Sequence, residues 1–124
     1  MNNMTSNEKK ALLLLKSVIF MYHGLDESEQ AILIKSAEEL DAKEELQWVN
    51  DFIAEDYYDA FEKSRDFLKE QMTALDKDKR LEYLKKVWGD NMQKGYISEM
   101  EAMGMLKLAK DWEIERELIL AIKK

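Results

Sequence analysis

The chain has 124 residues, with 26 acidic and 19 basic side chains, a formal net charge of -7 and no Cys. A domain of this length buries about two-thirds of the surface that its unfolded chain exposes, so one core is expected. The negative charge disfavours nucleic acid, which binds clustered Lys and Arg, and the absence of Cys excludes disulfides, thiolate zinc sites and Cys nucleophiles.

The first predicted helix begins near Thr5 and ends at Gly24. Thr5 and Glu8 fit a capping box, and an apolar run over residues 11–22 follows. This run is shorter than the roughly 20 apolar residues that cross a bilayer, and Lys16 interrupts it. We therefore expect a buried core helix and no membrane insertion. No small-residue cleavage site follows the run, so a cytoplasmic location is expected.

The second predicted helix begins at Asp26, which forms another capping box with Glu29, and runs to about Leu40. Residues 43–74 keep helical spacing without Gly or Pro. They form one long helix or two, because about 30 residues is long for a globular helix. We place a bend near the stretch AEDYYD, residues 54–59.

The last part of the chain predicts three further helices. A turn over residues 75–79 precedes an amphipathic helix that ends before Gly95. Ser98 and Glu101 fit a capping box for the next helix, and residues 113–124 form the last one. The predicted fold class is all-α, a single-domain bundle of six or seven helices over the whole chain.

A helix-turn-helix segment occurs twice, at about residues 10–45 and 80–122. Gly24 matches Gly95, and the second copy then has one extra residue, Tyr96. At an offset of 72, the matched pairs are Asp26 and Ser98, Glu27 and Glu99, Glu29 and Glu101, Lys35 and Lys107, Ala37 and Ala109, and Glu45 and Glu117. This agreement predicts an internal duplication.

An apolar helix, a Gly turn, a Ser or Asp cap and a Glu three residues later resemble the TerB-like family of bacterial tellurite-resistance and stress proteins. The stretch that carries this likeness best is KGYISEMEAMGMLKLAKDWEIE, residues 94–115. The resemblance implies an all-α bundle of two related halves, with acidic residues at both turns and a suspected role in metal binding. Where the family carries Asp before each turn glycine, this chain has His23 and Lys94.

We expect no cofactor, and a divalent metal at the two turns is the alternative. The candidate ligands are His23, Asp26, Glu27, Glu29, Asp90, Glu99 and Glu101. The first turn combines imidazole with carboxylates, a set compatible with zinc, nickel or manganese. The second has EF-hand spacing, but Met92 and Lys94 stand at the third and fifth ligand positions. The competing interpretation is that these carboxylates cap helices.

Catalysis finds little support, because the chain has one His, no Cys and no Gly-rich phosphate loop. Tyr57 and Phe61 share a helical face in the acidic middle segment, and Tyr58 lies beside them. These rings either pack in the core or form an exposed groove or dimer face. The favoured interpretation is a non-enzymatic binding or scaffold protein with a protein partner. The alternative is a metal-binding stress-response module.

Overall fold

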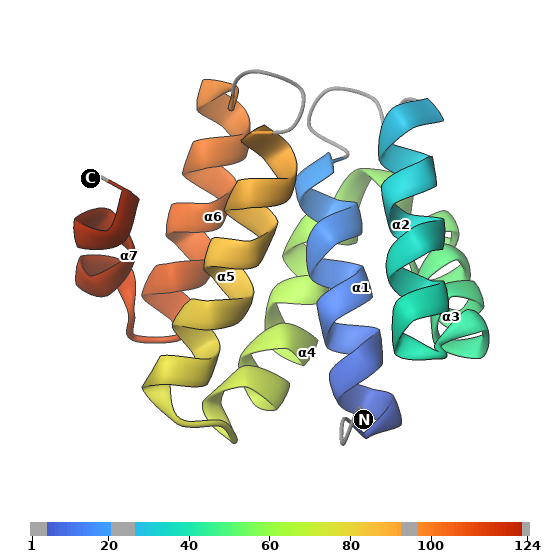
Figure 1. The fold of residues 1–124 in the computed structure, drawn as a ribbon, viewed down its shortest axis with the longest axis horizontal. Helices are drawn as coiled ribbons and strands as arrows, with labels where there is room; N and C mark the ends of the chain where they lie inside the picture. The colour runs from blue at the N-terminus through green and yellow to red at the C-terminus, as the bar shows by residue number, and fades with distance from the viewer. Residues whose placement is uncertain (1–4, 21–26, 93–96, 123–124) are drawn as a thin grey trace. The chain divides into compact units, whose positions relative to one another are not determined.

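The computed structural model describes residues 5–20, 27–92 and 97–122. These residues form seven α-helices and one 3-10 helix and contain no strand, which confirms the predicted all-α class (Figure 1). The elements are α1 (Ser6–Phe20), α2 (Glu27–Leu40), α3 (Lys43–Glu55), η2 (Tyr57–Asp59), α4 (Ala60–Thr73), α5 (Lys77–Met92), α6 (Glu99–Asp111) and α7 (Glu115–Ile122). No helix in this described part is long and apolar enough to cross a membrane.

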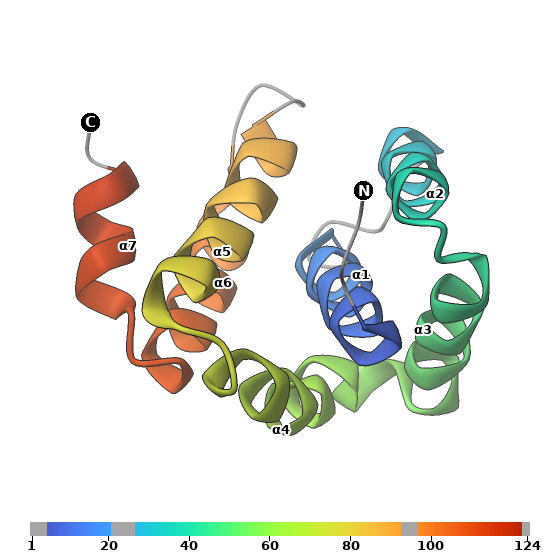
Figure 2. The ribbon, with the colours of Figure 1, turned by 60° about the horizontal axis from the view of Figure 1, so that its bottom comes forward.

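The chain divides into two compact units, residues 1–68 and 69–124. In the first unit α1 packs against α2 and α3, and these two helices pack against each other. In the second unit α5 packs against α6 and α7, and these two helices also pack against each other (Figures 1 and 2). Each unit therefore contains a three-helix arrangement of the same connectivity. The prediction of a single domain stays a prediction.

The core of the first unit forms around α1. All ten residues from Ala11 to Phe20 are buried. Ten successive residues of a helix point in every direction, so α1 is covered on all sides. Leu33 from α2 and Val49 from α3 are among the buried apolar side chains of this unit.

The core of the second unit comes from one face of each helix. Leu84 and Val87 on α5, Met105 on α6 and Leu118 on α7 are fully buried, as is Trp112 at the end of α6. This pattern is the ordinary amphipathic one, with an apolar stripe facing inward and a charged face outward.

The predicted bend near residues 54–59 is confirmed, and residues 43–74 form two α-helices. Asp56 leaves the helical conformation, with φ of -151° and ψ of 75°, directly after α3 ends. The 3-10 helix η2 then leads into α4. The indole of Trp48 on α3 lies 5.2 Å, between ring centroids, from Phe67 on α4, so aromatic packing joins the two helices across the bend.

Candidate functional site

The turn that joins α2 to α3 and the turn that joins α6 to α7 have the same backbone geometry. Asp41 and Glu113, which are 72 positions apart, both have positive φ, at 53° and 60°. The N-H groups that follow them reach back to equivalent carbonyls, from Ala42 to Ala37 and from Ile114 to Ala109, each at 2.8 Å. This is the Schellman pattern, in which a left-handed residue ends a helix.

The starts of α1 and α5 also match, at an offset of 71. The Thr5 hydroxyl accepts from the N-H of Glu8 at 3.1 Å, and the Asp76 carboxylate accepts from the N-H of Lys79 at 2.9 Å. The offset is therefore 71 before the Gly turns and 72 after them, as the extra residue Tyr96 requires. The caps and turns of the described residues therefore match at the offsets that the predicted duplication requires.

The predicted capping box at the start of α6 is present. The Ser98 hydroxyl accepts from the N-H of Glu101 at 3.2 Å, and the Glu101 carboxylate accepts from the N-H of Ser98 at 2.9 Å. Glu101 is fully buried, so its carboxylate satisfies a backbone donor inside the fold. This bond gives Glu101 a structural role at the turn.

The candidate metal ligands do not form one described cluster. His23 and Asp26 lie outside the residues that the structure describes. Glu27 and Glu99 are exposed at the starts of α2 and α6, whereas Glu29 is buried and Asp90 is half-buried. Within residues 5–20, 27–92 and 97–122, no group of three or more His, Asp or Glu side chains could hold a metal ion. A metal at the first turn stays a prediction, because two of its ligands are not described.

The three predicted surface aromatics differ in exposure. Tyr58 is 96% exposed and Tyr57 is 52% exposed, and their rings meet edge to face with centroids 5.8 Å apart. Phe61 is only partly exposed at the start of α4. Tyr57 and Tyr58, called here the tyrosine pair, therefore form an exposed aromatic surface on η2.

Charged side chains surround the tyrosine pair. Asp56 forms an ion pair with Lys63 at 2.9 Å, which connects the residue before η2 to α4. The hydrogen bond from Lys63 holds the pKa of the Asp56 carboxyl below its usual value, and the same bond raises the pKa of Lys63. Glu55 and Asp59 are exposed on either side of the tyrosines. The pair therefore has an acidic border.

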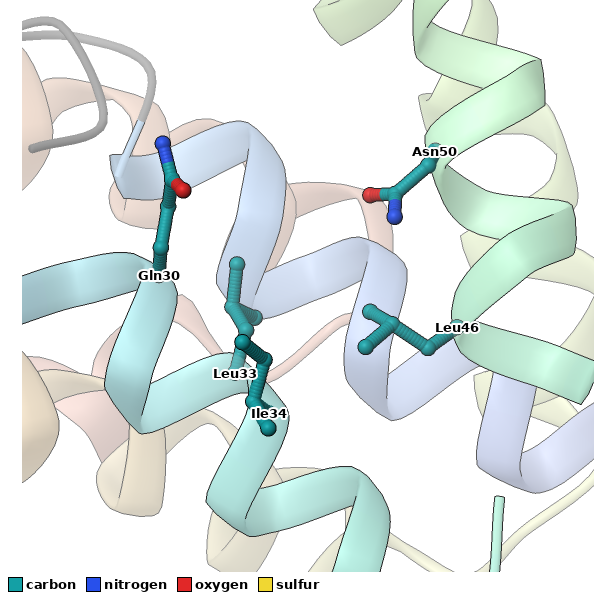
Figure 3. A pocket seen from close by; sticks show the side chains of 5 residues that line it. All are labelled: Gln30, Leu33, Ile34, Leu46 and Asn50. Carbon is teal, nitrogen blue, oxygen red and sulfur yellow. The ribbon is translucent and has the colours of Figure 1, made fainter. Parts of the chain in front are cut away.

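A pocket between α2 and α3 was not predicted from the sequence. It has a volume of about 290 Å³ and is lined by Gln30, Leu33, Ile34, Leu46 and Asn50. Figure 3 shows the first three side chains on α2 and the other two on α3. Ile34 is 53% exposed although it is apolar. An apolar residue at a position of α2 that faces away from the core was the one sequence feature that could have indicated this pocket.

Comparison of the chain with family models, with curated proteins and with solved structures finds no match.

Proposed function

We propose that this protein is a non-enzymatic binding or scaffold protein, and that the tyrosine pair is its contact for a protein partner. The observation that carries the proposal is the 96% exposure of Tyr58 beside the half-exposed Tyr57. A Tyr ring offers a large apolar face and a hydroxyl, and loses little side-chain entropy when it binds, so Tyr is enriched at protein interfaces.

The position of the pair supports recognition by a preformed surface. Asp56 and Lys63 hold η2 to the first turn of α4, and the ring contact between Trp48 and Phe67 joins the helices on either side. A surface that is already ordered costs less to bind than one that must be ordered on contact. The tyrosine pair is therefore suited to bind without a large rearrangement.

The border of the pair favours a basic partner segment. Glu55 and Asp59 are exposed next to it in the chain, and Glu62 is exposed in the first turn of α4. Arg or Lys from a partner would meet these carboxylates, and an Arg would also stack on a Tyr ring. We propose a partner with a basic, exposed segment, and a homodimer is the other occupant considered. The resemblance to TerB-like proteins extends the proposal to bacterial stress or tellurite resistance in the cytoplasm.

The proposal is tested with a displayed peptide library, selected on the full chain and counter-selected on the Tyr57→Ser/Tyr58→Ser variant. We expect basic peptides to be enriched, and Tyr58→Ser to weaken their binding by about tenfold or more, because exposed aromatic anchors dominate interface energies. Fluorescence anisotropy gives the Kd. Met103→Ser is the matched control, since Met103 is a half-exposed apolar residue on α6.

Two results would contradict the proposal. One is enrichment of peptides that bind the double Tyr variant as tightly as the parent. The other is a loss of binding in Met103→Ser equal to that in Tyr58→Ser. Sedimentation of the parent at increasing concentration separates the homodimer from a foreign partner.

A further inference from the structure

One buried polar contact joins α1 to α2 inside the core of the first unit. The Lys16 ammonium donates to the Ser36 hydroxyl at 2.8 Å. Lys16 is 2% exposed and Ser36 is 7% exposed, so the contact is shielded from water. A Lys in such a place is costly unless its donors find acceptors.

The duplication supplies an internal comparison for this contact. With the offsets of 71 and 72, Lys16 matches Val87 on α5, and Ser36 matches Leu108 on α6. Val87 and Leu108 are both fully buried. The same two positions therefore hold a Lys and a Ser that are hydrogen-bonded in the first unit, and two buried apolar residues in the second.

A chain built from two similar units has alternative ways to pair its helices. Helix α1 could pack on α6, and α5 on α2, within one chain or between two copies, because the turns and caps of the two units match. Exchange of equivalent elements is a known hazard of repeated folds. Something in the side chains must favour the native pairs.

The polar pair distinguishes native from exchanged pairing. Opposite Leu108, the Lys16 ammonium would lose its hydrogen bond to the Ser36 hydroxyl, and opposite Val87 the Ser36 hydroxyl would lose the bond from Lys16. Loss of a hydrogen bond at a buried polar group costs more than the bond contributes when formed. Both exchanged pairs are thus penalised, whereas the native pairs keep the hydrogen bond between Lys16 and Ser36.

We infer that the Lys16–Ser36 hydrogen bond is a pairing device, which makes α1 select α2 over the equivalent helix α6 and so prevents helix exchange between the two units. Buried polar groups that fix register at some cost in stability are known from coiled coils. The inference does not depend on the proposed function, because it concerns contacts within the first unit.

The test uses the full chain, whose lack of native Cys allows thiols to be placed freely. The Ser6 hydroxyl donates to the Glu45 carboxylate at 2.7 Å, so position 6 reports where α1 lies. The reporter chain carries Ser6→Cys, Glu45→Cys and Glu117→Cys, where Glu117 is the repeat equivalent of Glu45. After refolding from denaturant, a short bis-maleimide links position 6 to either partner, and mass spectrometry measures the ratio of the two products.

In the reporter chain we expect the link from 6 to 45 to dominate. Adding Lys16→Val and Ser36→Leu gives the first unit the residues that the second unit has at the two equivalent positions. The ratio of the 6–45 to the 6–117 product should then fall by about tenfold or more. Ser17→Ala is the matched control, because Ser17 is buried on α1 and its hydroxyl has no hydrogen-bond partner among the described residues. This control should leave the ratio unchanged.

A rescue variant completes the test by moving the pair into the second unit, with Val87→Lys and Leu108→Ser added to the changes at 16 and 36. The ratio should return toward the reporter value, since the two units again differ. An unchanged ratio in the Val and Leu variant would overturn the inference, and so would an equal fall in Ser17→Ala. Circular dichroism checks that each variant is helical. If the rescue variant is not helical, the inference is judged from the product ratios of the reporter chain and of the variant with Lys16→Val and Ser36→Leu.

Discussion

The two units share helix caps and turns of matching geometry but differ in their side chains, and the ends of α2 and α6 make the difference plain. Lys9 on α1 donates one hydrogen bond, to the Asp41 carbonyl after α2, at 3.3 Å. Its repeat equivalent on α5, Arg80, donates at 3.0 Å to the carbonyl of Trp112, which follows α6 and precedes Glu113, the equivalent of Asp41. Carbonyls at a helix C-terminus need donors from elsewhere, and in both units the neighbouring helix supplies a cation.

Arg80 does more than its counterpart. Its guanidinium also donates to three carbonyls at the end of α4 and the loop after it, those of Met72, Thr73 and Leu75, at 3.0 to 3.1 Å. A guanidinium presents five donors in a fixed plane, whereas an ammonium acts as a point charge. The comparison teaches that in each unit a cation from the neighbouring helix reaches a carbonyl at a helix end, whereas the residue that does so and the carbonyl that it reaches differ between the units.

The largest expected difference in stability is between equivalent substitutions on α1 and α5. Leu15 is fully buried on α1, whereas its equivalent on α5, Lys86, is exposed. Leu15→Ala should lower the free energy of unfolding by about 2 to 5 kcal/mol through lost burial and a cavity. Lys86→Ala should change it by less than about 0.5 kcal/mol. Urea unfolding measures both, and similar losses would contradict the different covering of α1 and α5.

The next difference separates Arg80 from Lys9. Arg80→Ala should cost about 2 to 3 kcal/mol, because several partly buried carbonyls lose a charged donor. Lys9→Ala should cost less than about 1 kcal/mol, since its single bond is exposed. Arg80→Lys keeps the charge without the planar fork, and thermal unfolding should place it between the parent and the Ala variant. If Arg80→Lys matched the parent, charge alone would account for the role of Arg80.

The capping carboxylates give a smaller effect. Glu101→Ala removes the bond to the Ser98 N-H and should cost about 0.5 to 2 kcal/mol. Glu29→Ala should cost the same if the first unit has the capping box predicted with Asp26. Chemical unfolding of both variants tests this equality, and a neutral Glu101→Ala would remove the capping argument.

Metal titration of the same proteins distinguishes a cap from a ligand. A metal at 100 times its Kd would contribute about 2.7 kcal/mol if it bound only the folded state. We expect no shift in Tm when millimolar Ca, Mg, Mn, Ni or Zn follows chelation. A shift that is lost in His23→Ala or Glu29→Ala would instead establish the metal-binding alternative.

The smallest expected effect is an increase in the free energy of unfolding. Glu113→Gly should stabilise the chain by up to about 1 kcal/mol, because a non-Gly residue with positive φ is strained. Asp41→Gly should stabilise the chain less than Glu113→Gly does, since Asp tolerates the left-handed region better than Glu. Differential scanning calorimetry of the two variants measures the difference. Destabilisation by Glu113→Gly would contradict the left-handed turn in the second unit.

Much of the fold could be predicted from the sequence, because helix starts and ends have local signals. Ser98 and Thr5 were recognised as caps, and the bend before η2 was placed correctly. The last helix was predicted from residue 113, whereas α7 begins at Glu115. Glu113 adopts a left-handed conformation that favours Gly, so its side chain gave no signal of the turn.

The tertiary features were harder to predict. The exposure of Tyr58 depends on which face of η2 is covered, and the 3-10 geometry of this segment breaks the helical spacing that placed it beside Phe61. The hydrogen bond from Lys16 to Ser36 joins residues 20 positions apart on two helices. In the sequence, Lys16 only interrupted an apolar run. Such contacts depend on helix packing, which periodicity alone does not define.

The central claim is that the chain contains the same three-helix arrangement twice, and the two Schellman turns test it most directly. Scalar couplings across hydrogen bonds, measured by NMR, identify the donor nitrogen and the acceptor carbonyl together. We predict couplings from the Ala42 nitrogen to the Ala37 carbonyl and from the Ile114 nitrogen to the Ala109 carbonyl. If either nitrogen were coupled to the carbonyl four residues earlier, that helix would continue through its turn, and the claim of a repeated unit would be contradicted.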